Sequence, residues 1–358
     1  MKTITFLFPA IAYAPTGGYK VVYEYANRLV NDGFKVNIIY SAYTKRHDVS
    51  WTINILRLCK SILRLFKCIL FRYKVSWFAL NPKVNEYVVP ILSKTFIPTS
   101  DIYVATSILT AIELNKWGSN KSKNIYLIQS FENWGGITDK EVISSYRYGF
   151  KNIVISKWLE RIVHKCGAQC VLIPNGFDFN YFQKTTEIKK RNRFCIAMLY
   201  HKQELKGCSD GFKALSIVKA KYPELTVNMF GVPPRPFNLP DWYNYYQQPE
   251  KEVFNQIYNE AAIFIGTSWY EGWGLTVGEA MICGCAIVCT DNDGYREMVE
   301  DGVTALLSPI KDPQSLANNI FKLIENDSLR CELSKRGNDH IKQFNWQTSY
   351  QKFKSVIE

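Results

Sequence analysis

Residues 267–288 read TSWYEGWGLTVGEAMICGCAIV, and the order of patterns around this stretch decides the fold of the second half of the chain. An apolar run, AAIFIGTS (261–268), leads into a loop with two glycines. A helical pattern begins at about Leu275 and gives way to a second apolar run, CAIVCT (285–290). A strand, a loop, a helix and a strand in this order predict a parallel sheet with helices on both faces.

The same alternation recurs along the whole chain. Further short apolar runs rich in β-branched residues lie at 4–9, 35–40, 101–107, 124–129, 152–156, 194–199, 225–231 and 304–309. A chain of 358 residues has room for two domains of about 150–200 residues each. We therefore expect an α/β protein built from two tandem doubly wound, Rossmann-like domains that face a cleft.

A polar, charged segment, TTEIKKRNR (185–193), follows the first set of strands and marks the domain boundary. We expect an N-terminal domain over 1–178 and a C-terminal domain over 179–340. The last stretch, 341–358, predicts a helix that returns to the N-terminal domain. Its apolar residues fall near one another at helical spacing: Ile341, Phe344, Tyr350, Phe353 and Val356.

The composition is that of a globular protein, with 47% hydrophobic and 21% charged residues. The first residues, Met1–Phe8, read as a buried strand and not as a signal peptide, so reduced thiols in a cytoplasm are the simplest account of the ten cysteines. The spacing of His164, Cys166 and Cys170 matches no common zinc pattern, and the chain contains no CxxC pair. We expect no metal there.

Two glutamates and two glycines make residues 267–288 a candidate ligand-binding segment. Glycines 272 and 274 let the backbone approach a ligand closely and leave free N–H groups at a helix N-terminus, which suits a phosphate or a sugar hydroxyl. Glu271 lies in the loop. Glu279 lies in the helix between mostly apolar neighbours, and a buried carboxylate needs a partner.

This stretch resembles the glutamate–seven–glutamate signature of retaining glycosyltransferases of family 4, which have the GT-B fold. The matching positions are Ser268, Glu271, Gly272, Gly274, Leu275, Glu279, Ala280, Met281 and Gly284. Other motifs of the family follow in the right order over essentially the whole chain: GG (17–18), IVISKW (153–158), IPNGFD (173–178), LKG (205–207) and TDNDGYREMVEDGVTALL (290–307).

The resemblance implies roles for individual residues. Glu279 would hold the ribose hydroxyls of a nucleotide. Glu271 and the backbone of Gly272, Trp273, Gly274 and Leu275 would contact the donor sugar. Lys206 would neutralise the diphosphate, so that Glu271 and Lys206 are the expected catalytic residues, and Gly17 and Gly18 would bring N–H groups to the same phosphates. Such preorganised donors stabilise charge on a departing diphosphate.

Two positions depart from the family pattern. Where the family usually has an Arg, this chain has Tyr200, and Lys202 either supplies the second cation for donor binding or is an ordinary solvated side chain. Where the family often has a His, this chain has Gln129, and the loop resembles the Q-x-x-E variants of some polysaccharide glycosyltransferases. Gln129 and Glu132 are therefore expected on the acceptor side.

The triplet Asp291-Asn292-Asp293 reads as a D-x-D metal motif of the other glycosyltransferase fold, but it falls within the family 4 resemblance, after the strand at 285–290. We therefore expect catalysis without a metal and without any cofactor, the nucleotide-diphosphate sugar being the donor substrate.

A basic amphipathic segment is expected at 53–74, since no acidic residue occurs between Asp48 and Glu86. Its cations fall on one helical stripe: Arg57, Lys60, Arg64, Lys67 and Lys74. Residues 1–179 hold 23 basic and 11 acidic residues, whereas residues 180–358 hold 21 of each, so the net charge of +12 lies in the first half. The segment is either a core helix with a solvated basic face or a helix that lies on an anionic lipid surface, and we favour the second.

The expected function is that of a hexosyltransferase. The enzyme would be cytoplasmic, peripheral at the inner face of the cell membrane, and would move a hexose-type sugar to a glycan or lipid-linked glycan acceptor in surface polysaccharide biosynthesis. The alternatives are an epimerase or phosphorylase-like enzyme and a non-catalytic nucleotide-sugar-binding protein of the same fold. A basic isoelectric point near 9 also permits nucleic-acid binding. We expect no nucleic-acid partner, because no nucleic-acid motif occurs and the signature lies in the neutral half.

Overall fold

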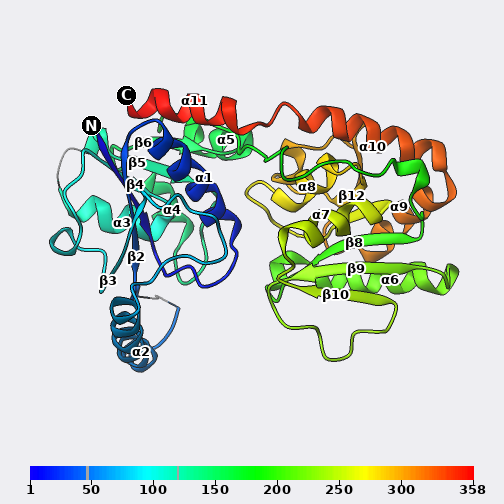
Figure 1. Cartoon of the computed structure of the whole chain (residues 1–358), viewed down its shortest axis with the longest axis horizontal. Coiled ribbons are helices and arrows are strands. Elements are labelled where there is room, and N and C mark those ends of the chain that lie inside the picture. The colour runs from blue at the N-terminus through cyan, green and yellow to red at the C-terminus, as the bar shows by residue number, and fades with distance from the viewer. Residues whose placement is uncertain (46–47, 119–120) are drawn as a thin grey trace. The chain divides into compact units, whose positions relative to one another are not determined.

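The computed structural model describes residues 1–45, 48–118 and 121–358, which divide into two compact units (Figure 1). The first unit comprises Met1–Pro174 and Gln347–Glu358, and the second comprises Asn175–Trp346. Each unit is a parallel sheet with helices between its strands, so the expected pair of doubly wound α/β domains is confirmed. The chain leaves the first unit four residues before the boundary expected at 178.

The first unit has a seven-stranded sheet in the described part of the chain, in the order β3-β2-β1-β4-β5-β6-β7. Its strands are β1 (Thr3–Phe8), β2 (Lys35–Ser41), β3 (Asn85–Val89), β4 (Ile102–Ala105), β5 (Ile125–Ile128), β6 (Lys151–Val154) and β7 (Cys170–Leu172). Its helices are α1 (Gly17–Asn31), α2 (Trp51–Leu70), α3 (Ile108–Lys116), α4 (Asp139–Ser145), α5 (Lys157–Lys165) and α11 (Trp346–Ile357). The central strands β1, β4 and β5 are almost wholly buried, as expected for apolar runs covered on both faces.

The C-terminal helix α11 packs on the first unit through an aromatic side chain. The ring of Phe353 stacks on that of Tyr25 in α1 at 4.3 Å and lies 6.3 Å from the ring of Phe6 in β1. Lys354 Nζ forms an ion pair of 2.6 Å with Asp32 at the end of α1. The end of the chain is therefore held against α1 and β1 by both apolar and charged contacts.

The single helix expected over 341–358 is wrong at its start. Ile341 is the last residue of α10 (Asp327–Ile341), and α11 begins only at Trp346. The backbone between them is in use elsewhere, because the N–H of Phe177 donates to the carbonyl of Phe344 at 3.0 Å and Phe177 forms a parallel bridge with Asn345. The carbonyl of Phe344 is therefore engaged by Phe177, and the helix does not continue through Phe344 and Asn345.

The second unit has a six-stranded sheet among the described residues, in the order β10-β9-β8-β11-β12-β13. Its strands are β8 (Cys195–Tyr200), β9 (Thr226–Gly231), β10 (Tyr243–Gln247), β11 (Ile263–Gly266), β12 (Ala286–Thr290) and β13 (Ala305–Ser308). The helices between and after them are α6 (Cys208–Lys221), α7 (Lys251–Glu260), α8 (Leu275–Ile282), α9 (Pro313–Glu325) and α10. Strands β11 and β12 are buried throughout and lie at the centre of the core.

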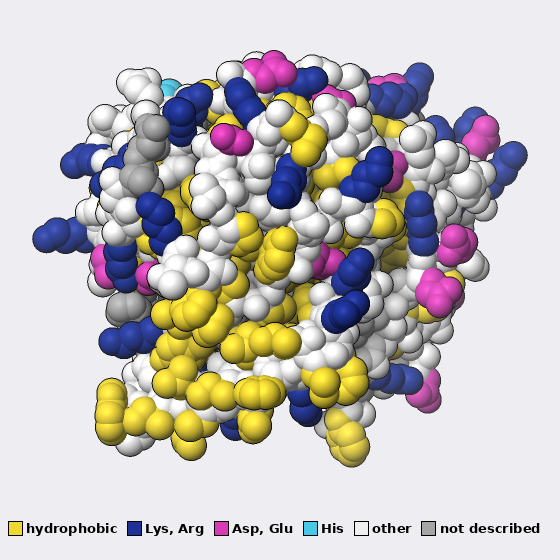
Figure 2. Space-filling view, turned by 60° about the vertical axis from the view of Figure 1, so that its left-hand side comes forward, with side chains coloured by type: hydrophobic (Ala, Val, Ile, Leu, Met, Phe, Trp, Pro, Cys, Tyr) yellow, Lys and Arg dark blue, Asp and Glu magenta, His cyan; other side chains and the backbone are white. Residues whose placement is uncertain are grey.

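Helix α2 differs from the other helices because it turns a polar face inward and an apolar face outward. Its buried residues are Asn54, Ser61 and Cys68, at spacings of seven. Exposed apolar side chains cover much of the remaining surface: Trp51, Ile53, Ile55, Leu56, Leu58, Ile62, Leu63, Phe66, Ile69 and Leu70, with Phe71 just beyond its end. Figure 2 shows hydrophobic side chains gathered in the lower part of the view, where α2 lies in Figure 1.

The basic segment expected at 53–74 is only partly helical, since α2 ends at Leu70 and Lys74 lies beyond it. The side chain of Arg57 is half-buried and donates from Nη2 to the carbonyl of Thr44 at 3.3 Å. Lys60, Arg64 and Lys67 are exposed. Of the five cations expected on one helical stripe, only these three both belong to α2 and face solvent. Among the helices of the described chain, none is long and apolar enough to cross a membrane.

Candidate functional site

The second sheet reverses its winding between β8 and β11, and the candidate donor residues lie there. Strands β9 and β10 lie on one side of β8, and β12 and β13 lie beyond β11. Loops that follow two such strands diverge, which opens a crevice at their carboxyl ends where α/β proteins bind ligands. The loop after β8 carries Lys202 and Lys206, and the loop after β11 carries Glu271.

The two expected catalytic side chains contact each other. Lys206 Nζ lies 2.7 Å from Glu271 Oε1, and the two side chains are 25% and 14% exposed. The same carboxylate oxygen accepts a hydrogen bond of 2.7 Å from the hydroxyl of Ser268. Residues 65 positions apart thus form one partly buried charged cluster, in which the ammonium group keeps access to solvent.

Backbone contacts hold the loop of Lys206 against the loop of Glu271. The hydroxyl of Thr267 donates to the carbonyl of Lys206 at 2.8 Å, and the N–H of Trp269 donates to the carbonyl of Leu205 at 2.8 Å. Gly207 makes this approach possible, because it has φ of +58° and any Cβ there would lie 2.0 Å from the carbonyl oxygen of Thr267. In the LKG segment (205–207), the close approach to Thr267 therefore requires the glycine, and Lys206 supplies the charge.

The glycine loop 272–274 ends at the first residue of α8, Leu275. Gly274 has φ of +97°, and a Cβ there would lie 2.5 Å from the ring of Tyr295, so only glycine fits. The first N–H groups of a helix have no partner within the helix and favour an anionic ligand. The side chain of Trp273 is buried against the ring of Phe344, so this residue can offer a ligand only its backbone.

Glu279 occupies the interior of the second unit, as expected. It is 4% exposed and lies in the second half of α8. Its Oε2 accepts a hydrogen bond of 3.3 Å from the hydroxyl of Tyr258 in α7. Burial first, and then the neighbouring charge of Glu279, raise the pKa of Tyr181, which places a second phenol close to this carboxylate.

The position that replaces the family's Arg is not a cation. The ring of Tyr200 packs against the rings of Phe212 and Tyr245. Lys202 is exposed and forms no ion pair with any described residue. His201 lies closer to the cluster: burial, and then the charge of Lys206, lower its pKa, and its Nδ1 accepts a hydrogen bond of 3.0 Å from the N–H of Gln203.

The triplet at 291–293 is engaged by protein groups. Asp291 forms an ion pair with Arg296, whose Nη2 lies 2.7 Å from Asp291 Oδ2. The amide of Asn292 is buried and donates to the carbonyl of Ser268 at 2.9 Å. Asn292 therefore supports the loop that carries Glu271, whereas the carboxylate of Asp291 is held by Arg296 in its own loop. Within the described ranges, no three His, Cys, Asp or Glu side chains are grouped for metal binding.

The expected residues of the first unit gather at its own reversal point, between β1 and β4. Gly17 and Gly18 begin α1, and a Cβ on Gly18 would lie 3.3 Å from Gln129 Nε2. Glu132 Oε2 accepts a hydrogen bond of 2.5 Å from the N–H of Ile108, the first residue of α3. Burial raises the pKa of Glu132 to about 7. This carboxyl group therefore titrates near neutral pH, next to the glycine turn and Gln129.

Residues that sequence reasoning did not select also belong to these clusters. Ser268 was matched only as part of a motif, yet it orients Glu271. Tyr258 and Tyr181 carry no motif, and only the fold brings them to Glu279.

Comparisons with known proteins find similarity to glycosyltransferases. Residues 181–340 match the family model of glycosyl transferases group 1. The chain is 32% identical over 106 residues to the O-antigen chain mannosyltransferase B of Escherichia coli, a match that covers 30% of this chain and 27% of that protein. It is 22% identical over 190 residues to the phosphatidyl-myo-inositol mannosyltransferase of Mycolicibacterium smegmatis, covering 50% of this chain and 49% of that protein. The chain thus spans from a quarter to half of the length of such relatives.

Solved structures match over the full length. The Anabaena protein HepE in complex with UDP-glucose superposes with a TM-score of 0.71 at 16% identity, covering 100% of this chain and 99% of that one. Sucrose-phosphate synthase of Thermosynechococcus elongatus gives a TM-score of 0.72 at 16% identity, covering 99% and 98%. These likenesses confirm the GT-B fold, and the family model and the relatives support the class of GT-B glycosyltransferases for this chain.

Proposed function

We propose that this protein is a retaining glycosyltransferase of family 4 that moves a hexose-type sugar from a nucleotide-diphosphate sugar to a glycan or lipid-linked glycan. The proposal rests on one observation above all. Lys206, Glu271 and the glycine loop before α8 meet where the second sheet reverses its winding. An ammonium group and free helix N–H groups at one crevice suit a diphosphate, and a carboxylate beside them suits sugar hydroxyls.

The chain's own residues have distinct tasks in this proposal. The ammonium group of Lys206, now paired with Glu271, binds the diphosphate and stabilises the charge that grows on it as the glycosidic bond breaks. Glu271, oriented by Ser268, accepts hydrogen bonds from hydroxyls of the donor sugar. Glu279 binds the ribose hydroxyls, with Tyr258 holding its carboxylate in place.

The acceptor belongs to the first unit in this proposal. Gln129 and Glu132 carry hydrogen-bonding groups for an acceptor hydroxyl. Gly17 and Gly18, at the start of α1, offer N–H groups to the phosphates of the donor. The exposed apolar face and the three solvent-facing cations of α2 lie on the inner face of the cell membrane, where a lipid-linked acceptor is found. A role in surface polysaccharide biosynthesis fits the O-antigen mannosyltransferase among the relatives.

The test is transfer from a panel of nucleotide-diphosphate sugars to a lipid extract, with NMR of the product. We expect a glycosidic linkage with the anomeric configuration of the donor, formed equally well in excess chelator. Lys206→Ala should lower turnover, whereas Lys202→Ala, which removes an exposed cation nearby, should not. Inversion of configuration would overturn the retaining assignment. Conversion of the donor without any acceptor would favour an epimerase, and donor binding without turnover would favour a non-catalytic binding protein.

A further inference from the structure

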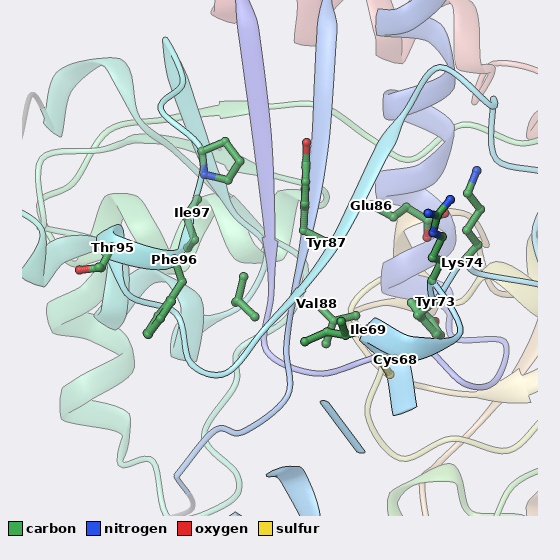
Figure 3. A pocket seen from close by; sticks show the side chains of 13 residues that line it. Cys68, Ile69, Tyr73, Lys74, Glu86, Tyr87, Val88, Thr95, Phe96 and Ile97 are labelled. Carbon is green, nitrogen blue, oxygen red and sulfur yellow. The ribbon is translucent and has the colours of Figure 1, made fainter. Parts of the chain in front are cut away.

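A groove of about 690 Å³ runs along the outer edge of β3, which is an edge strand of the first sheet. Figure 3 shows Glu86, Tyr73 and Lys74 on one side of this strand and Thr95, Phe96 and Ile97 on the other. Nothing in the proposed donor or acceptor chemistry uses this groove. Its volume is typical of cavities that bind small organic ligands.

The groove is mainly apolar and continues the outward face of α2. Nine of its thirteen lining side chains are apolar: Cys68, Ile69, Tyr73, Tyr87, Val88, Val89, Phe96, Ile97 and Pro98. Three of these, Ile69, Tyr87 and Phe96, are large and at least 40% exposed. Ile69 belongs both to the exposed face of α2 and to the groove wall. The exposed apolar face of α2 therefore continues into the groove at Ile69.

Two cations line the same groove. Arg72 and Lys74 are exposed, and neither forms an ion pair with a described residue. The one acidic side chain of the lining, Glu86, is held by the protein: its Oε2 accepts hydrogen bonds from the N–H of Val75 at 3.0 Å and from the hydroxyl of Tyr40 at 3.1 Å. Lys74 also acts on Glu86, since its charge is one of the influences that lower the pKa of this carboxyl group against the effect of burial. Arg72 and Lys74 thus lie exposed at a cavity that is otherwise lined mainly by apolar side chains.

We propose that this groove binds one anionic phospholipid of the membrane, with its phosphate at Arg72 and Lys74 and part of an acyl chain along Ile69, Tyr87, Val88 and Phe96. This deepens the membrane docking given above and rests on it. The site adds a saturable, one-to-one lipid contact to the general attraction of α2 for a charged surface. Arginine and lysine are the usual partners of phosphate, and hydrocarbon is the usual partner of an exposed apolar wall.

A different occupant, an extended peptide that adds a strand to β3, fits the observations less well. The outer edge of β3 has unpaired backbone groups, as any edge strand has. A peptide strand would not account for two exposed cations beside a mainly apolar cavity, or for the continuity with α2. The charge and the apolar lining together favour an amphiphile.

The experiment uses a short-chain phospholipid below its micelle concentration, so that no membrane surface is present. Dihexanoyl phosphatidylglycerol should bind wild type saturably with one-to-one stoichiometry in calorimetry. Arg72→Asn with Lys74→Gln should weaken this binding by roughly tenfold or more, the effect of losing charged hydrogen bonds. Asn suits position 72 because Arg72 has φ of +46°, a region that Asn tolerates.

The matched control removes the same charge from α2 through Lys60→Gln with Lys67→Gln, two exposed residues. This pair should leave binding of the monomeric lipid unchanged while weakening attachment to anionic vesicles. Absence of saturable binding by wild type, or equal loss in both pairs, would overturn the groove assignment. Weak binding of the anionic lipid together with tight binding of an extended peptide would overturn it in favour of strand addition. Failure of the docking proposal would appear separately, as wild type that ignores anionic vesicles, and failure of the transferase assignment as absence of sugar transfer.

Discussion

Neutralising the solvent-facing cations of α2 should release the protein from anionic membranes. The variant is Lys60→Gln, Arg64→Gln and Lys67→Gln; Arg57 is left in place because it donates to the carbonyl of Thr44 and supports the loop before α2. Each cation near an anionic surface contributes about 1 kcal/mol, so three contribute about 3 kcal/mol. That free energy corresponds to roughly a hundredfold change in the partition coefficient.

The assay is co-sedimentation with vesicles that contain an anionic phospholipid, at low and at high salt. Binding of wild type should fall with salt because salt screens the cations, and binding of the variant should be weaker and should depend less on salt. The control, Lys123→Gln with Lys140→Gln and Lys157→Gln, removes three exposed cations from elsewhere in the same unit. If this control loses as much binding as the α2 variant, net charge and not α2 determines attachment to the membrane.

Three further predictions concern the sites. Glu279→Gln keeps the size of the side chain and a partner for Tyr258, and it should weaken nucleotide affinity by about 1–3 kcal/mol in calorimetry, because it loses charged hydrogen bonds to ribose. Burial raises the pKa of Glu132 from 4.5 to about 7, so the folded state favours the protonated carboxyl group. The free energy of unfolding of wild type should therefore fall by at most about 3 kcal/mol as pH rises from 4.5 to 7. Glu132→Gln should flatten this dependence in denaturant titrations. Gly207→Ala should destabilise the protein by more than about 2 kcal/mol, whereas Gly302→Ala, with a similar φ but nothing within 4 Å, should cost only about 1–2 kcal/mol.

The sequence predicts the central strands well and the edges of the sheets poorly. Continuous apolar runs identify strands that are covered on both faces, such as β1 and β11. The strands it misses, β3, β7 and β10, all lie at sheet edges, where half-exposed positions accept polar and aromatic residues and the pattern is lost.

The candidate site follows the same logic. Motif residues such as Lys206 and Glu271 fall in loops after strands, so their meeting could be expected from the fold. Tyr258 approaches Glu279 only because α7 packs beside α8, and no local pattern encodes that. The sequence also could not predict which face of α2 is buried, because periodicity shows that two faces differ but not which of them packs against the protein. Here a small polar face with Asn54 and Ser61 is buried and the apolar side is exposed.

The proposed donor site is tested most directly by calorimetric titration with nucleoside diphosphates. We expect at least one nucleoside diphosphate to bind wild type, and Lys206→Ala to weaken this binding by roughly tenfold to a hundredfold, the effect of losing a charged hydrogen bond to phosphate. Lys202→Ala should bind like wild type. Absence of binding by every nucleoside diphosphate, or undiminished binding by Lys206→Ala, would contradict the proposed donor site.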